Sequence, residues 1–523
     1  MTDPEFAEPL AERRTSAADL RVMVKGSAVQ FAGFGINRFA SLAFVAVAVR
    51  FLSPAGYGLY RQVAQLLQMI GNMGPGGFDV AGLRWIAKAR ASNDPGGVRG
   101  AARVAFTGAT LVSLSLGLAV FLAAAWIARG FADTPADVEP MVELLHLGAA
   151  FIPLYALMQV VRFACQGFKT NIPSVVAGNV VQPLSLVVVS LGGLALGWGV
   201  RGLIIGLMAS AALGLVTALW FFHRIRSRDE KMAPAGNPIG PMVRFAIPQW
   251  GVTLFRIGGL GPHLVLLGLL SSDLDVGLFA IGNSLQGLAL IFPQAILSLW
   301  APMVADLHER GDMDRLGALY QTVTRWMASF SFLFIAALII QPEFFVRVLA
   351  GSEAADAALL TSILALGTLF TVATGPCGSV ITMTGYPVVN LANSVAGMGL
   401  YIGAALWLAP RYGALGMAGI DAGMSFLLNL ARVLEAKYLA GIQPYSRTFL
   451  KPIGATLASS AVLLGWRFLP WEGLLWVVPG LLLACVVHFG VLWAGGIDPE
   501  DRFVWERTVA KLRSARPGRE DGP

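Results

Sequence analysis

Long apolar segments, each followed by a short polar or charged segment, run along almost the whole chain. A helix that crosses a membrane needs about 20 predominantly apolar residues, and the pattern contains fourteen segments of that kind. The sequence therefore predicts an all-α polytopic membrane protein. The expected spans are 25–50, 57–80, 102–128, 140–166, 174–197, 200–222, 243–270, 277–303, 317–341, 356–382, 388–409, 413–436, 452–469 and 473–494.

The composition excludes several classes of protein. Of the 523 residues, 56% are hydrophobic and 13% are charged, whereas a soluble domain carries about 25% charged residues. The chain is therefore not a soluble enzyme, a nucleic-acid-binding module or a disordered scaffold. The longest expected outer loop, 342–356, is too short for a catalytic domain. No enzymatic activity, metal site or cofactor is expected.

The basic residues gather on one predicted side of the membrane. The formal net charge is +7, and most of the 38 Lys and Arg residues lie in the tails and in alternate loops. The opposite side holds only Arg50, Arg129, Arg201, Arg347, Arg411 and Arg467. Cytoplasmic loops carry the excess of Lys and Arg, so both termini are predicted to be cytoplasmic. This bias also explains the positive charge without a nucleic-acid partner.

The two halves of the chain repeat one another at matched positions. LSPAGYGLY (52–60) follows the first span and LSSDLDVGLF (270–279) follows the seventh, and an arginine precedes each motif by fourteen residues. Four further pairs share one constant offset: Pro173 with Pro387, Asn179 with Asn393, Gly199 with Gly413, and Gly202 with Gly416. A constant offset indicates a duplication, although glycine and proline are also common punctuation in membrane helices.

The repeat predicts two pseudo-symmetric six-helix lobes followed by two additional helices. An even number of spans per lobe gives both copies the same topology, with a substrate path between them. The expected divisions are a cytoplasmic N-terminal tail 1–20, an N-lobe 21–226, a cytoplasmic linker 227–243, a C-lobe 244–440, helices 13 and 14 in 441–495, and a basic cytoplasmic C-terminal tail 496–523.

Polar side chains recur at helical spacing within several spans. Residues three or four positions apart share one face of a helix, and polar groups inside a bilayer are expected to face a hydrated interior. The stripes therefore predict a polar lumen. Its expected lining is Gln30, Asn37, Gln65, Gln68, Asn72, Gln159, Gln249, Asn283 and Gln286. His488, alone in its span, is predicted to be structural.

The deep charges are mostly basic. Arg38 and Arg256 lie near the middle of their spans, and Arg61 and Arg162 lie closer to the ends, where they can reach the membrane surface. A guanidinium stays charged when buried and needs an anion, and its planar fork suits phosphate oxygens. The alternative is that Arg38 and Arg256 brace helix packing through carbonyls or through Asp421, the only deep acid.

Three motifs carry a family resemblance: LSPAGYGLYRQV (52–63), MTGYPVVNLANSV (383–395) and RYGALGMAGIDAG (411–423). With the doubled six-helix lobe, they resemble the polysaccharide-biosynthesis flippases of the multidrug/oligosaccharidyl-lipid/polysaccharide (MOP) exporter superfamily. The resemblance implies a transporter of the inner membrane that moves an undecaprenyl-diphosphate-linked oligosaccharide, for exopolysaccharide, capsule or O-antigen synthesis. It implies a polysaccharide polymerase and glycosyltransferases as partners. It also implies a diphosphate site that comprises Arg38 and Arg256, with Arg61 and Arg162 beside them.

Two other functions stay open. Lipid II flippases share the fourteen helices and the basic lumen. Multidrug antiporters of the same superfamily usually have 12 helices and a cation-binding acid in the N-lobe, and spans 1 to 6 of this chain contain no deep acid. Asp421 and His263 are the candidate residues for proton or sodium coupling, and His263 is equally consistent with a hydrogen-bonded wall residue.

Overall fold

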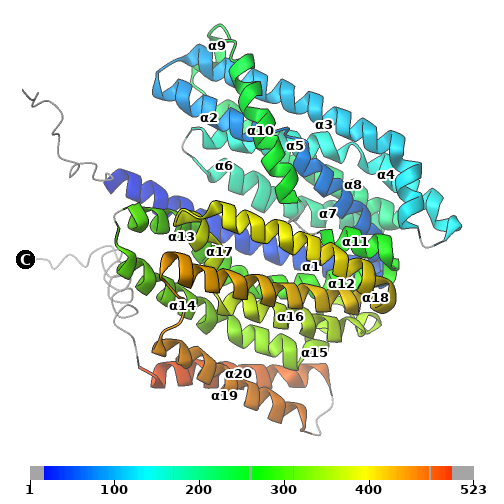
Figure 1. Ribbon diagram of the computed structural model, residues 1–523. Helices are drawn as coiled ribbons and strands as arrows, with labels where there is room; N and C mark the ends of the chain where they lie inside the picture. Colours follow the sequence, from blue (N-terminus) through cyan, green and yellow to red (C-terminus); the bar gives the residue numbers. More distant parts are fainter. Residues whose placement is uncertain are drawn as a thin grey trace, which may run out of the picture. The chain divides into compact units, whose positions relative to one another are not determined.

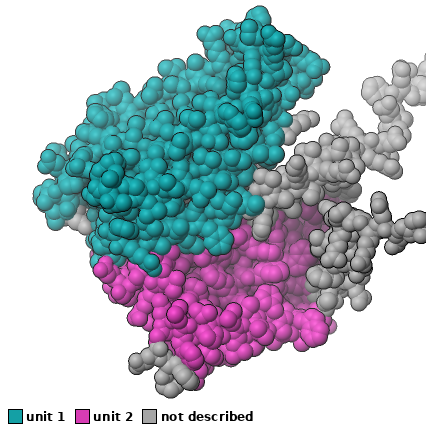
Figure 2. Space-filling view, turned by 180° about the vertical axis from the view of Figure 1, so that it is seen from behind, with its two compact units in different colours: residues 1–277 teal, residues 278–523 magenta. Residues whose placement is uncertain are grey.

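The computed structural model describes residues 17–132, 134–168, 170–257, 262–309, 311–469 and 473–496. The regular structure of these residues is entirely helical (Figure 1), which confirms the predicted all-α class. The chain divides into two compact units, unit 1 over residues 1–277 and unit 2 over 278–523 (Figure 2). The division lies beyond the expected linker 227–243 because helices that follow the linker pack against helices 1 and 2 of the chain. The two lobes expected from the repeat stay a prediction.

Unit 1 contains eleven numbered α-helices among its described residues and the start of a twelfth. One π-helical stretch, η2 (Val176–Val181), interrupts the segment between α6 and α7. The helices are α1 (Ala17–Met73), α2 (Phe78–Ala91), α3 (Pro95–Phe131), α4 (Val138–Gly148), α5 (Phe151–Gln166), α6 (Ile172–Val175), α7 (Gln182–Ala195), α8 (Gly199–Ile225), α9 (Arg228–Met232), α10 (Ile239–Ile257), α11 (Pro262–Leu270) and the beginning of α12 (Asp273–Ala289).

Unit 2 continues from α12 and ends with two adjacent helices, α19 and α20 (Figure 1). Its core joins α14 to both of them through Ala337, Leu463 and Ala484. The helices are α13 (Ile291–Glu309), α14 (Met313–Ile340), α15 (Pro342–Ala350), α16 (Ala357–Ala373), α17 (Cys377–Met383), α18 (Pro387–Ala440), α19 (Leu450–Arg467) and α20 (Val477–Ala494).

The two longest helices each contain a sharp reversal. In α1 the backbone leaves the helical region at Ser53, with φ of 66°, immediately before Pro54. The rings of Phe44 and Tyr60 on the two arms lie 5.3 Å apart. In α18 the break is at Gly413, with φ of 52°, a conformation that glycine adopts without steric cost. The arms of α18 match the predicted spans 388–409 and 413–436, and the arms of α1 contain the predicted span 25–50 and most of 57–80.

Ten helical stretches of the described residues are long and apolar enough to cross a membrane. Two of them, 32–73 and 388–440, have 42 and 53 residues and include the reversals just described. A crossing needs about 20 residues, so each of these stretches is long enough for two. The chain is a multi-pass membrane protein, and the count of fourteen spans stays a prediction.

Three short helices lie where the sequence predicted connections. The expected outer loop 342–356 contains α15, which ends at Gly351 with φ of 85°. Helix α2 occupies the segment between the second and third expected spans, and α9 lies inside the expected linker. These corrections share a cause: each helix is too short to span a bilayer, so a search for long apolar segments passes over it. The expected tails fall largely on residues 1–16 and 497–523, which lie outside the described residues.

Small residues make up much of the core of unit 1. The buried cluster under α2, α3, α5 and α8 includes Ala101, Ala105, Ala164 and Ala218. Membrane helices associate through close packing of small side chains, because lipid supplies no hydrophobic drive between them. This packing fixes α5 against α8 and α3, and thereby fixes the polar face of α5.

Candidate functional site: a polar cluster on two helices

Four polar side chains of the second arm of α1 and of α5 form one hydrogen-bonded chain. Arg162 Nη1 donates to Gln159 Oε1 at 2.6 Å, and Gln159 Nε2 donates to the Tyr155 hydroxyl at 3.3 Å. The Tyr155 hydroxyl donates in turn to Asn72 Oδ1 at 3.4 Å. Positions 155, 159 and 162 share one face of α5 because they follow the helical period. We call Asn72, Tyr155, Gln159 and Arg162 the Arg162 cluster.

A glycine in the π-helical stretch makes room for the Arg162 guanidinium. A Cβ placed on Gly178 would overlap the guanidinium carbon of Arg162. The Arg162 carbonyl accepts a hydrogen bond from Ser174 Oγ at 3.0 Å, and Gln166 Nε2 donates to that hydroxyl at 3.0 Å. Single-turn π-bulges occur frequently at functional sites. The segment 172–181 therefore contacts both the guanidinium and the backbone carbonyl of Arg162.

The arginines of this region have no carboxylate partner among the described residues. The ion pairs of that part of the chain join other residues. The Nε atoms of Arg61 and Arg162 are buried and have no hydrogen-bond partner in the part of the chain that the structure describes. Arg38, on the first arm of α1, is partly buried and makes no hydrogen bond to a described residue. A buried guanidinium without an anion is costly, so these positions suit an anionic ligand.

The structure brings three of the predicted site residues into one hydrogen-bonded cluster. Asn72, Gln159 and Arg162 meet in one cluster. The remaining lining residues with described side chains are partly buried, on α1, α10 and α12: Asn37, Gln65, Gln68, Gln249, Asn283 and Gln286. Gln30 and Arg256 belong to α1 and α10, and their side chains lie outside the described residues. The predicted pairing of Arg38 with Arg256 stays a prediction.

The two candidate coupling residues lie in different units. His263 is on α11 in unit 1. Asp421 is on the second arm of α18 in unit 2, beside the Tyr401 hydroxyl of the first arm. Both residues make an interaction in the structure. Their proposed role in ion coupling stays a prediction.

Sequence reasoning missed two groups that support this region. Gln62 is buried, and its Nε2 donates to Asp273 Oδ1 at 2.6 Å. The predicted stripe followed Arg61, Gln65, Gln68 and Asn72 and did not include Gln62, although Gln62 lies three positions before Gln65. Gly178 lies in a long apolar span that contains several small residues. No signal in the sequence distinguishes it from an ordinary packing glycine.

The sequence matches the model of one protein family, described as polysaccharide biosynthesis protein, over residues 23–308. That match covers more than half of the chain. A search of curated proteins finds no significant match.

Solved structures share the fold. An inward-closed structure of the lipid II flippase MurJ has a TM-score of 0.71 and 10% identity, covering 90% of this chain and 98% of its own. An inward-facing MATE multidrug resistance transporter of the MOP superfamily has a TM-score of 0.63 and 14% identity, covering 79% and 98%. A MOP superfamily transporter from Pyrococcus furiosus, described as having a binding pocket of reverse polarity, has a TM-score of 0.53 and 16% identity, covering 80% and 96%.

Proposed function

Because the chain belongs to the polysaccharide biosynthesis protein family, we propose that it is a flippase for an undecaprenyl-diphosphate-linked oligosaccharide. It would carry this lipid across the cytoplasmic membrane for exopolysaccharide, capsule or O-antigen synthesis. The observation that carries the proposal is the set of arginines described above. Arg38 and Arg162 lie partly buried in apolar helices without a carboxylate among the described residues, and a diphosphate supplies the missing negative charge.

The division of roles follows from side-chain chemistry. The arginines, Arg256 and Arg61 included, bind the diphosphate, because guanidinium forks match phosphate oxygens. The amides of Gln65, Gln68 and Asn72 present donors and acceptors to sugar hydroxyls. The polyprenyl chain stays in lipid. Transport needs no covalent step, so neither nucleophile nor cofactor takes part.

Transport would proceed by alternating access of two lobes. An anion leaving the cytoplasm moves in the direction favoured by an inside-negative potential, by about 2.3 kcal/mol per charge per 100 mV. Proton or sodium coupling through Asp421 or His263 is a secondary hypothesis. The distribution of Lys and Arg supports cytoplasmic positions for both termini, and the proposed function requires the inner membrane. A polymerase and glycosyltransferases would act on the same lipid-linked intermediate.

The second candidate function is the transport of lipid II. The observation that favours it is the similarity to MurJ, which extends over 90% of this chain. Both candidate substrates carry a lipid diphosphate and differ in the glycan, so the arginines serve either function. A multidrug antiporter would instead depend on an acidic cation site such as Asp421.

The test uses a strain that lacks its own polysaccharide flippase and makes no surface glycan. Expression of this chain should restore the glycan, and Arg38→Ala and Arg256→Ala should each abolish export while the protein still accumulates in the membrane. Arg129→Ala is the control, because Arg129 is an exposed residue at the end of α3. Normal export by both arginine variants would overturn the proposed site.

A second strain, depleted of its lipid II flippase, separates the two functions. Growth of that strain on this chain, without restored surface glycan in the first strain, would favour lipid II. Restored glycan without growth would favour the oligosaccharide. If neither surface glycan nor growth is restored, both proposed functions are overturned.

A further inference from the structure

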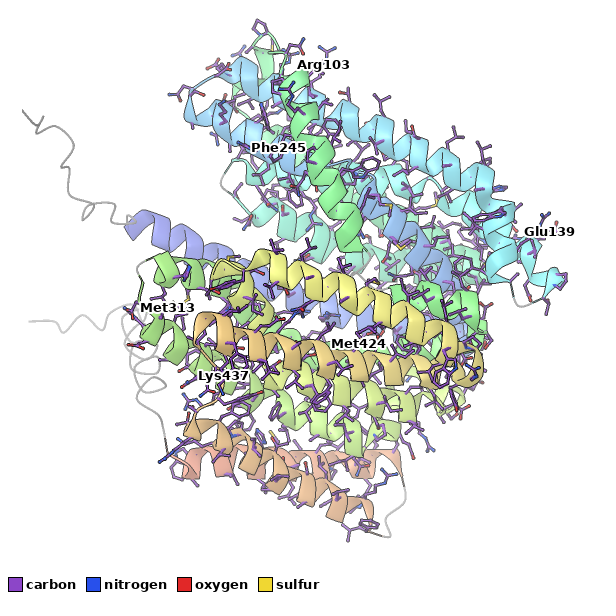
Figure 3. The ribbon with its side chains drawn as sticks, viewed as in Figure 1. Arg103, Glu139, Phe245, Met313, Met424 and Lys437 are labelled. Atoms are coloured by element: carbon purple, nitrogen blue, oxygen red, sulfur yellow. The ribbon has the colours of Figure 1, made fainter. Side chains whose placement is uncertain are left out.

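A basic cavity of about 610 Å³ lies at the end of unit 1 where α8 meets the segment leading to α9. Three arginines and a histidine line it: Arg99, Arg103, His223 and Arg226. Phe106 and Phe222 form its apolar floor, with ring centroids 5.3 Å apart. Figure 3 labels Arg103 on α3 near the end that carries α9. None of these residues belongs to the Arg162 cluster.

No carboxylate of the described residues forms an ion pair with a basic group of the cavity. Glu230, the acid whose charge reaches Arg226, is held elsewhere. Its Oε1 accepts from Arg90 Nε at 3.1 Å, and its Oε2 accepts from the backbone N–H of Ser227 at 2.8 Å.

The guanidiniums are held in place by the protein. Arg226 lies over the Phe222 ring, 4.5 Å from its centroid, and its Nε is buried without a hydrogen-bond partner among the described residues. Arg99 Nη1 donates to the Ala233 carbonyl at 2.8 Å. Burial lowers the pKa of Arg226, Glu230 opposes that shift and Arg99 adds to it. The cavity therefore brings the positive charge of Arg99 close to the partly desolvated guanidinium of Arg226.

Apolar, exposed helix faces lead directly to this cavity. On α3, Leu114 and Leu118 follow Arg103 on the same face and are 52% and 58% exposed. On α8, Val216 lies on the face of His223 and is 62% exposed. In a multi-pass membrane protein such faces meet acyl chains, and the basic groups then lie at the depth of lipid headgroups.

From these observations we propose that the cavity binds a phosphate-bearing anion at the cytoplasmic end of unit 1, apart from the transported lipid. Basic pockets at the cytoplasmic ends of membrane helices suit anionic headgroups. The phosphate would be shared by Arg103 of α3 and Arg226 beyond α8, so binding joins α3 to the segment that follows α8. Two sources have this chemistry: the headgroup of an anionic phospholipid, which the neighbouring apolar faces favour, and a soluble phosphorylated molecule.

The test measures binding to the purified, delipidated full-length chain in detergent by native mass spectrometry. The probes are phosphatidylglycerol, the zwitterionic phosphatidylcholine and glycerol 3-phosphate. Phosphatidylglycerol should bind more tightly than phosphatidylcholine. The double variant Arg103→Gln/Arg226→Gln should lose roughly tenfold or more of that affinity, because hydrogen bonds to charged groups are the stronger ones. Glycerol 3-phosphate that competes for the site identifies a soluble ligand, and its failure to compete identifies the lipid.

Two further variants serve as a control and as a replacement in this test. Arg224→Gln is the matched control: Arg224 lies on the same helix end, stacks on Trp220 at 4.7 Å and is outside the cavity. It should keep wild-type binding. If the double variant does not purify as a folded protein, the single variant Arg103→Gln replaces it, because the Arg103 side chain is exposed. Equal binding of both lipids, or wild-type binding by the folded cavity variant, would overturn the proposal.

Discussion

Gly58 and Gly277 make reciprocal contacts in unit 1. A Cβ placed on Gly58 would overlap the carbonyl oxygen of Asp273, and a Cβ placed on Gly277 would overlap the carbonyl oxygen of Pro54. Each glycine lies four residues after the position that its counterpart contacts. The two motifs LSPAGYGLY and LSSDLDVGLF therefore pack against one another through reciprocal glycine–carbonyl contacts, as the predicted repeat would require.

This contact predicts that Gly58→Ala and Gly277→Ala each destabilise the protein. The added methyl group meets backbone atoms, which cannot rotate away, so roughly 1–3 kcal/mol of stability should be lost, as for other overpacked sites. The measurement is the thermal unfolding midpoint of the purified protein in detergent. Gly35→Ala is the control, because nothing lies within 4 Å of a Cβ at that position. Equal midpoints for all three variants would contradict the close packing.

Gly178 offers a way to move Arg162 without removing its charge. An alanine there displaces the end of a flexible side chain and meets less resistance than a backbone clash. We expect Gly178→Ala to lower transport severalfold, with a smaller loss of stability than Gly58→Ala shows. Transport of the labelled lipid-linked oligosaccharide in proteoliposomes checks this. Gly192→Ala, on α7 with open space around its Cβ, should leave transport unchanged. Unaltered transport by Gly178→Ala would contradict a role of Arg162 in substrate binding.

The hydrophobic pattern predicted the helical class because long apolar segments leave few alternatives in a bilayer. It also gave the shared face of Gln159 and Arg162, because the helical period alone fixes which residues of one helix lie together. It did not give the partner of that face. Tyr155 and Asn72 meet across two helices, and only packing between helices decides such a contact.

The backbone features around the site could not be predicted from the sequence for a related reason. The π-helical stretch at Val176–Val181 inserts one residue into the helical register, and nothing in its apolar sequence marks the insertion. The reversal at Ser53 was located approximately, because the following Pro54 and Gly56 are typical of a break. Helices as short as α9 depend on local capping: the side chain of Ser227 caps that helix and Glu230 completes the capping box.

Two ion pairs that differ in burial allow a comparison of how much each pair contributes to stability. The Glu230 side chain is 10% exposed where it pairs with Arg90, whereas Glu143, paired with Arg201, is 48% exposed. Glu230→Gln should cost more stability than Glu143→Gln, because an exposed pair contributes only about 0–1 kcal/mol. Glu230→Gln also weakens the capping box of α9. Thermal unfolding in low and high salt checks this, since screening should affect the Glu143 pair more. A larger loss for Glu143→Gln would contradict the expected ranking.

His488 connects α20 to α14 inside unit 2. It is fully buried, its Nε2 lies 2.9 Å from the Ser329 carbonyl oxygen, and its Nδ1 lies 3.5 Å from Ser459 Oγ. A carbonyl oxygen only accepts, so Nε2 carries the proton and donates. His488→Ala removes this donor and leaves a cavity, and about 1–3 kcal/mol of stability should be lost. The thermal midpoint should therefore decrease, while transport below the midpoint stays at the wild-type level.

Two comparisons separate this structural role from a functional one. His488→Gln keeps a donor and should recover part of the lost stability, whereas Val486→Ala, at a position 70% exposed on the same helix, should change little. The structural role requires that stability and transport respond separately. Loss of transport by His488→Ala at an unchanged midpoint would instead place His488 in the transport mechanism, because a residue that only joins two helices acts through the stability of that contact.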